Sequence, residues 1–344
     1  MHAGRKLPFS AQSDGKRGTI VMRKTIVLLL GIIGAVLIYF TSASAYKVFR
    51  ADLRPPRTPL AQSAEYRLVL ITQELETPFW DKVASGARDE AARRGAMLEV
   101  WGSYNNDSDE FLKKLEIAIH SRMDGILVQG LDTDAFKELV KYKAASYGIP
   151  VITVANDVPD SLRRTYVGSD HFEAGRMIAR QLAEDMGPRG TVILLRDSGN
   201  AYYQEQRLEG IRSVLGSYPG IELRFAEARG TREQVIADMQ DLMNRSPDVQ
   251  AFIAANANLT AAMVQEIGRR SRVQPYHIYS FDDSPDMLTL LREGLIDGII
   301  EQSPEAMGRI GAQLMIDWLS GERLPLDSGG YHTEIRLRKA RDIP

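Results

Sequence analysis

Polar and aromatic side chains recur where short β-branched runs of the sequence end. In the first half of the chain they are Thr77, Phe79, Trp80, Asn156 and Asp157, and in the second half they are Tyr203, Asn256, Asp282 and Gln302. Amides and carboxylates hydrogen-bond adjacent hydroxyl groups in pairs, and an aromatic face packs on the apolar C–H face of a sugar ring. Nothing marks Asp157 and Asp282 as an acid–base pair, so these residues predict binding of a sugar or polyol without catalysis.

The elements that must position these side chains alternate regularly from Tyr66 onward. Strands are predicted at 67–71, 97–101, 125–128, 150–154, 191–195, 221–225, 250–254, 276–280 and 297–301. Helices are predicted at about 79–94, 109–121, 134–147, 171–186, 202–216, 231–245, 259–270, 285–293 and 304–319. This alternation predicts an α/β fold with parallel sheets, which bind ligands beyond the carboxyl ends of their strands.

One stretch of the sequence occurs in two similar copies. Residues 173–182, EAGRMIARQL, are echoed by residues 305–314, EAMGRIGAQL, and helical runs through Gly86 and Gly210 follow two similar strands. The duplication predicts two similar lobes with a cleft between them. We interpret the repeated Gly-Arg pairs as places of close helix packing and not as phosphate sites, because the sequence has no Walker-type glycine-rich loop.

Composition narrows the possible functions. The 344 residues are enough for two domains, and 44% hydrophobic with 26% charged residues is typical of a globular protein. A net charge of −2 gives no electrostatic reason to expect a nucleic-acid partner. The chain has no cysteine, and its five histidines lack metal-ligand spacing. We therefore expect no cofactor and no metal.

The N-terminal segment predicts a location outside the cytoplasm. Ile26–Phe40 carries no charge, follows a basic pair and precedes small residues, which is the order of a secretory signal. Thr25–Ala45 is also long enough for an uncleaved transmembrane anchor, so both alternatives stay open for residues 1–45. Met22 is an alternative start. Residues 46–65 are predicted to be an extended, proline-containing linker.

Several short motifs, taken in order, resemble the type I periplasmic sugar-binding proteins. This is the ribose- and galactose-binding family of ABC transporter substrate-binding proteins, which shares its fold with lactose-repressor-like ligand domains. The resemblance covers about residues 66–340. The motifs are residues 77–80 (TPFW), 124–128 (DGILV), 148–151 (GIPV), 167–170 (VGSD), 207–210 (RLEG), 281–282 (FD) and 301–302 (EQ).

The resemblance implies two similar doubly wound parallel-sheet lobes joined by three hinge crossovers, which close on a ligand. Crossovers are then expected near 168–170, 301–303 and 325–331. The N-terminal lobe would comprise 66–168 plus 303–328, and the C-terminal lobe 169–302 plus 329–344.

The resemblance also implies roles for single residues. Phe79 and Trp80 would sandwich the sugar, and Asn256, Asp282 and Gln302 would form a polar set in the second lobe and hinge. Three positions depart from the family pattern and leave the identity of the sugar open. Thr77 stands where asparagine is usual, Ala155 followed by Asn156 and Asp157 stands where aspartate is usual, and Glu205 occupies a ligand position that often holds arginine.

Each candidate also has a purely structural interpretation. Phe79 and Trp80 could pack a helix start on the sheet, since Pro78 suits a first helical turn. Asp282 could cap a helix, and so could Asn256. Arg207 is interpreted as a tie between helix and loop.

Two functions remain open. In the first, the protein delivers a monosaccharide to the membrane permease of an ABC-type importer. In the second, it is a membrane-anchored sensor subunit that signals to a histidine kinase or another membrane partner. A transcriptional repressor is rejected, because the apolar segment occupies the place of a DNA-binding domain, and a glycoside hydrolase is not supported by the residues.

Overall fold

The computed structural model describes residues 34–41, 65–104, 106–197, 202–228, 232–270 and 276–343. The chain divides after Ala61, and the second unit, Gln62–Pro344, contains both lobes. The signal peptide or anchor and the linker lie outside the described residues, except for a short helix at residues 34–41. Within the described ranges, no helix is long and apolar enough to cross a membrane.

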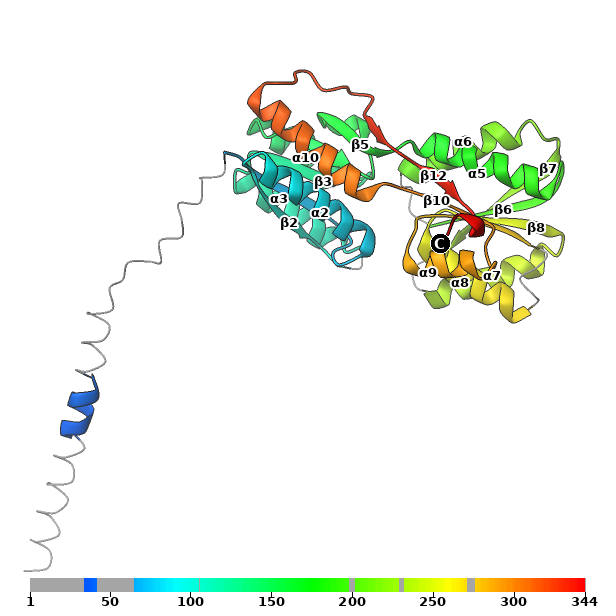
Figure 1. Ribbon diagram of the computed structural model, residues 1–344, viewed down its shortest axis with the longest axis horizontal. Helices are drawn as coiled ribbons and strands as arrows, with labels where there is room; N and C mark the ends of the chain where they lie inside the picture. Colours follow the sequence, from blue (N-terminus) through cyan, green and yellow to red (C-terminus); the bar gives the residue numbers. More distant parts are fainter. Residues whose placement is uncertain are drawn as a thin grey trace, which may run out of the picture. The chain divides into compact units, whose positions relative to one another are not determined.

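The first lobe is a six-stranded sheet with helices on both faces (Figure 1). Its strand order is β11-β5-β4-β3-β1-β2, and every pair is parallel. The strands are β1 (Arg67–Thr72), β2 (Met97–Gly102), β3 (Gly125–Gln129), β4 (Val151–Val154), β5 (Thr165–Ser169) and β11 (Tyr331–Thr333). The helices are α2 (Pro78–Arg93), α3 (Ser108–His120), α4 (Asp134–Glu138) with the π-helical segment Leu139–Ala144, and α10 (Pro304–Ser320).

The second lobe repeats this arrangement with the order β12-β10-β9-β8-β6-β7. Its strands are β6 (Arg189–Asp197), β7 (Gly220–Ala228), β8 (Val249–Ala254), β9 (His277–Phe281), β10 (Gly298–Glu301) and β12 (Arg336–Arg338). Its helices are α5 (His171–Met186), α6 (Tyr202–Leu215), α7 (Arg232–Arg245), α8 (Ala257–Arg270) and α9 (Pro285–Arg292). All strand pairs are parallel except β12 with β10. Two similar doubly wound lobes are thus confirmed.

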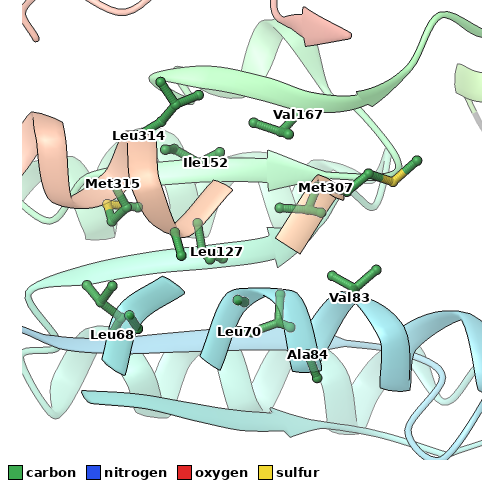
Figure 2. Close-up of a cluster of buried hydrophobic side chains, with 14 of the residues drawn as sticks. Leu68, Leu70, Val83, Ala84, Leu127, Ile152, Val167, Met307, Leu314 and Met315 are labelled. Carbon is green, nitrogen blue, oxygen red and sulfur yellow. The ribbon is translucent and has the colours of Figure 1, made fainter. Parts of the chain in front are cut away.

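Alternation along each strand sends neighbouring side chains to opposite layers. In β1, Leu68 and Leu70 pack with α2 and α10, whereas Val69 and Ile71 pack with α3 and α4. Figure 2 shows the first of these layers, in which Met315 and its neighbours on α10 face the sheet. A strand covered on both faces must be apolar throughout, which explains the continuous hydrophobic runs that made the strands predictable.

Close contact between two pairs of helices explains the duplicated sequence. α2 and α10 lie side by side and meet at Gly86 and Gly308, where an added Cβ would lie within 3.0 Å of the facing helix backbone. α5 and α6 meet in the same way at Gly175 and Gly210. The interpretation of the repeated glycines as packing sites is confirmed.

The crossovers correct one predicted boundary. The first follows β5 at Asp170 and the second lies at residues 302–303, as predicted. The third runs from Thr333 to Arg336 and not at 325–331. Because β11 pairs with β5, residues 331–333 belong to the first sheet, and their predicted place in the second lobe is wrong.

Candidate functional site

The first candidate residues lie where β1 leads into α2. Thr77 caps the helix, since its hydroxyl accepts the backbone N–H of Trp80. Trp80 is only 3% exposed, and its indole N–H donates to the Glu74 carboxylate at 3.0 Å. Phe79 is half-buried and meets the Trp80 ring edge to face, with the centroids 5.7 Å apart. Trp80 therefore belongs to the core of the first lobe, and Phe79 is the ring that stays partly exposed.

The turn after β4 carries the next two candidates. Ala155 adopts a φ of +64°, a conformation in which residues other than glycine are uncommon. Asp157 is buried, and its carboxylate accepts hydrogen bonds from Thr153 at 2.8 Å and from Arg163, which approaches Oδ2 at 2.6 Å. The Asp157 carboxylate thus stabilises the turn, while Asn156 is half-buried beside it.

In the second lobe, β8 and β9 end at two further candidates. Asn256 caps α8, because its Oδ1 accepts the Leu259 N–H at 3.0 Å. Asp282 has a φ of +75°, and its N–H donates to the Ile300 carbonyl at 2.8 Å. Burial raises the pKa of the Asp282 carboxyl, and the Arg207 guanidinium partly opposes that rise. β4 and β9 are each the third strand in the order of their sheet. The residues with positive φ that follow them, Ala155 and Asp282, therefore lie in equivalent, strained turns of the two lobes.

Gln302 connects the two lobes at the second crossover. Its Oε1 accepts the Ser169 hydroxyl at 2.6 Å, and its Nε2 donates to the Asp282 carboxylate. Ser169 ends β5 of the first sheet, and Asp282 follows β9 of the second. Gln302, buried at 8% exposure, therefore joins the carboxyl ends of strands from both sheets.

Arg207 supports the second half of the candidate site, and its interpretation as a tie between helix and loop is confirmed. It is 3% exposed, and its guanidinium lies 3.9 Å from the Phe281 ring centroid and 4.9 Å from that of Tyr203. It also donates to the Ala255 carbonyl. Burial lowers the pKa of Arg207, yet the group remains a cation because an arginine pKa starts so high. Ala255 and Phe281 each directly precede a candidate residue, so Arg207 orders both strand ends.

Glu205 is set apart from these residues. Its carboxylate accepts from Arg196 at 2.6 Å, and Arg196 also binds Glu227 at 2.6 Å. Among the described residues, no hydrogen bond or ion pair joins Glu205 to the other candidates.

His171, one of the five histidines, spans the first crossover. It begins α5 of the second lobe, and its Nε2 donates to the Ala155 carbonyl of the first lobe at 3.0 Å. The Tyr166 hydroxyl lies 3.3 Å from the same nitrogen, and the Tyr203 ring centroid lies 5.6 Å from the imidazole. Burial and the charge of Arg207 lower the pKa of His171 to about 3, so the ring is neutral.

A cavity of about 390 Å³ opens beside the second crossover. Its lining residues are Lys82, Asp283, Glu301, Gln302, Ser303, Pro304, Glu305, Ala306 and Arg309. Lys82 comes from α2 of the first lobe and Asp283 from the second, so both lobes line it. The described residues contain no cluster of three or more potential metal ligands.

Comparison with known proteins identifies the family. Residues 68–323 match the periplasmic binding protein domain. The chain belongs to this family. The chain is 23% identical to the ribose import binding protein of Bacillus subtilis (strain 168) over 285 residues, which cover 82% of this chain and 92% of that protein. It is 24% identical to the D-allose-binding periplasmic protein of Escherichia coli (strain K12), over 77% of this chain and 88% of the relative.

Solved structures agree with this assignment. The crystal structure of GanP, a glucose-galactose binding protein from Geobacillus stearothermophilus, has a TM-score of 0.77 and 30% identity, over 81% of this chain and 99% of GanP. The family consists of non-enzymatic solute-binding proteins, which confirms the prediction that this protein is not an enzyme.

Proposed function

We propose that the protein binds a monosaccharide or a related polyol between its two lobes, outside the cytoplasm, and delivers it to the membrane permease of an ABC-type importer. The observation that carries this proposal is the connection Ser169–Gln302–Asp282, which brings polar groups from both sheets together at their carboxyl ends. Ligands of open α/β sheets bind at that edge.

The chemistry of the surrounding side chains supports a hydroxyl-rich ligand. Asn156, Asn256, Asp282 and Gln302 supply planar amides and a carboxylate, and the half-buried Phe79 supplies an aromatic face. The named relatives bind or import ribose, allose, and glucose or galactose, which supports a sugar without selecting one.

Import is favoured over a sensor role by the relatives. The sensor alternative depended on a retained membrane anchor, and that segment lies almost wholly outside the described residues. One structure of the same fold, the XylFII-LytSN complex, has a TM-score of 0.72 at 23% identity, which is a likeness of fold alone.

A thermal-shift screen of a protein spanning residues 62–344 tests the proposal. The panel is pentoses, hexoses and polyols, because a ligand that binds only the folded state raises the melting temperature by mass action. Isothermal titration of the best ligand then compares Asp282→Asn with the unaltered protein. We expect at least tenfold weaker binding, about 1.4 kcal/mol. An asparagine amide has one acceptor oxygen where the carboxylate has two, so it can no longer accept hydrogen bonds from two sugar hydroxyl groups in the same way.

Asp286→Asn is the matched control. Asp286 is exposed in the first turn of α9, four residues along the chain, and its substitution should leave the affinity unchanged. Equal affinities of all three proteins would refute the site, and no response to any sugar or polyol would refute the ligand class.

A further inference from the structure

An ion pair connects the two lobes beside the second crossover. Lys82 lies on α2 of the first lobe, and Asp283 follows β9 of the second. Lys82 Nζ donates to Asp283 Oδ2 at 3.1 Å, although the two residues are 201 positions apart in the chain. Because each lobe supplies one charge, the contact exists only while the lobes are held close together.

The pair lies directly beside the candidate site. Lys82 comes two residues after Trp80, and Asp283 comes one residue after Asp282. Both charged residues also line the 390 Å³ cavity together with Gln302. A change in the distance between Lys82 and Asp283 would therefore change the opening between the two halves of the site.

The surroundings favour the pairing of these two charges. The Asp283 side chain is only 16% exposed, whereas Lys82 is 50% exposed. Glu301, another carboxylate of the cavity, is held by Arg338 at 3.0 Å. Among the described residues, Lys82 is the one cation within ion-pair distance of Asp283. Opening the lobes would separate Lys82 from Asp283 and break this ion pair.

We propose that Lys82 and Asp283 form a latch that holds the lobes together around a bound ligand and slows its release. The inference rests on the proposed sugar-binding function, and it assigns a role to two residues that need not touch the ligand. A partly exposed ion pair contributes modestly, so the effect should be a few-fold change in the release rate and not loss of binding.

Stopped-flow measurement of ligand release tests the latch, using the best sugar or polyol from the screen. We expect Lys82→Gln and Asp283→Asn each to speed release about threefold, and the charge exchange Lys82→Asp with Asp283→Lys to restore most of the difference. Added NaCl should speed release from the unaltered protein more than from Lys82→Gln, because salt screens the pair.

Lys143→Gln is the matched control. It breaks a 2.6 Å ion pair with Glu116 that lies wholly within the first lobe, and it should leave the release rate unchanged. If Lys82→Gln and Asp283→Asn release ligand at the unaltered rate while Asp282→Asn still weakens binding, the latch is refuted and the sugar site stands.

The latch can be measured even if no sugar binds. The chain has no cysteine, so exposed Ser121 in the first lobe and exposed Ser217 in the second can be replaced by cysteine and spin-labelled without other changes. Electron–electron distance measurements should then give longer or broader distances in Lys82→Gln than in the unaltered protein. Identical distance distributions would overturn the proposal.

Discussion

The candidate residues differ in the hydrogen bonds that their side chains already make within the protein, and these bonds indicate which side chains are suited to bind a ligand. Asp157 and Asp282 both follow strands. The Asp157 carboxylate already accepts hydrogen bonds from Arg163 and Thr153, whereas the Asp282 carboxylate accepts one from the hinge residue Gln302. Ligand contacts require groups whose hydrogen bonds can be exchanged at little loss. A carboxylate tied to a buried arginine within its own lobe is poorly suited to that exchange.

His171 provides a prediction at this scale. Its pKa is about 3 in the folded protein against an ordinary value of 6.5, so the unfolded chain takes up the proton first as the pH falls. The stabilisation is complete above pH 6.5 and is lost progressively towards pH 3. Between pH 7.5 and pH 5 we expect this group to remove about 2 kcal/mol from the free energy of unfolding.

Urea unfolding at the two pH values measures this effect. His171→Gln should lose the part of the pH dependence that His171 contributes, whatever its stability at pH 7.5. His120→Gln, at a histidine that is 58% exposed, should keep the slope of the unaltered protein. The same slope in His171→Gln would contradict a buried neutral imidazole.

The sequence predicted the candidate site better by position than by role. Strand ends could be located because buried strands are continuous apolar runs, and Asn256, Asp282 and Gln302 do follow strands. The role of Trp80 depends on its hydrogen bond to Glu74, and that of Glu205 on its hydrogen bond from Arg196. The sequence alone does not reveal such pairs, because the packed structure determines which side chains meet. The assignment of Phe79 and Trp80 as a sugar clamp stays a prediction.

At the scale of elements, the two close helix pairs provide the next prediction. In α10, a Cβ at Gly308 would lie within 3.0 Å of the Val83 carbonyl, so Gly308→Ala must push α2 and α10 apart. We expect the free energy of unfolding to fall by about 2 kcal/mol. Urea denaturation of residues 62–344 measures it.

Gly311→Ala, on the same helix, is the matched control. Its Cβ would lie 3.5 Å from Val154 Cγ2, an ordinary contact, and alanine is the better helix former by about 1 kcal/mol. This variant should be at least as stable as the unaltered protein. Similar losses in both variants would show that close packing at Gly308 does not explain the duplicated glycine.

Elements with a local signal were predictable, and those defined by distant partners were not. The long helices carry capping residues and apolar periodicity, such as Thr77 before α2 and Asp170 before α5. By contrast, β11 and β12 have only three residues each, and β11 exists as a strand because β5 lies beside it. Pairing between segments more than 160 residues apart leaves no pattern in either segment alone.

At the scale of the whole molecule, each lobe is assembled from segments far apart in the chain. The core of the first lobe combines Leu70 and Leu127 of the sheet with Met307 and Leu314 of α10. α10 and β11 join that lobe only after the chain has passed through the second one. Three crossovers therefore join two lobes, neither of which is a continuous stretch of sequence.

This assembly predicts which fragments fold. Residues 65–170 alone lack α10 and β11, so their apolar layer against α2 stays open, and we expect no cooperative thermal unfolding. Joining residues 302–334 through a short glycine-rich linker should restore it, because Ser169 and Gln302 lie within hydrogen-bond distance and the new connection is short. Circular dichroism during heating compares the two proteins. Cooperative melting of residues 65–170 alone would show that this part of the lobe folds without α10 and β11. Cooperative melting of the joined protein alone would show that the lobe needs both segments to fold.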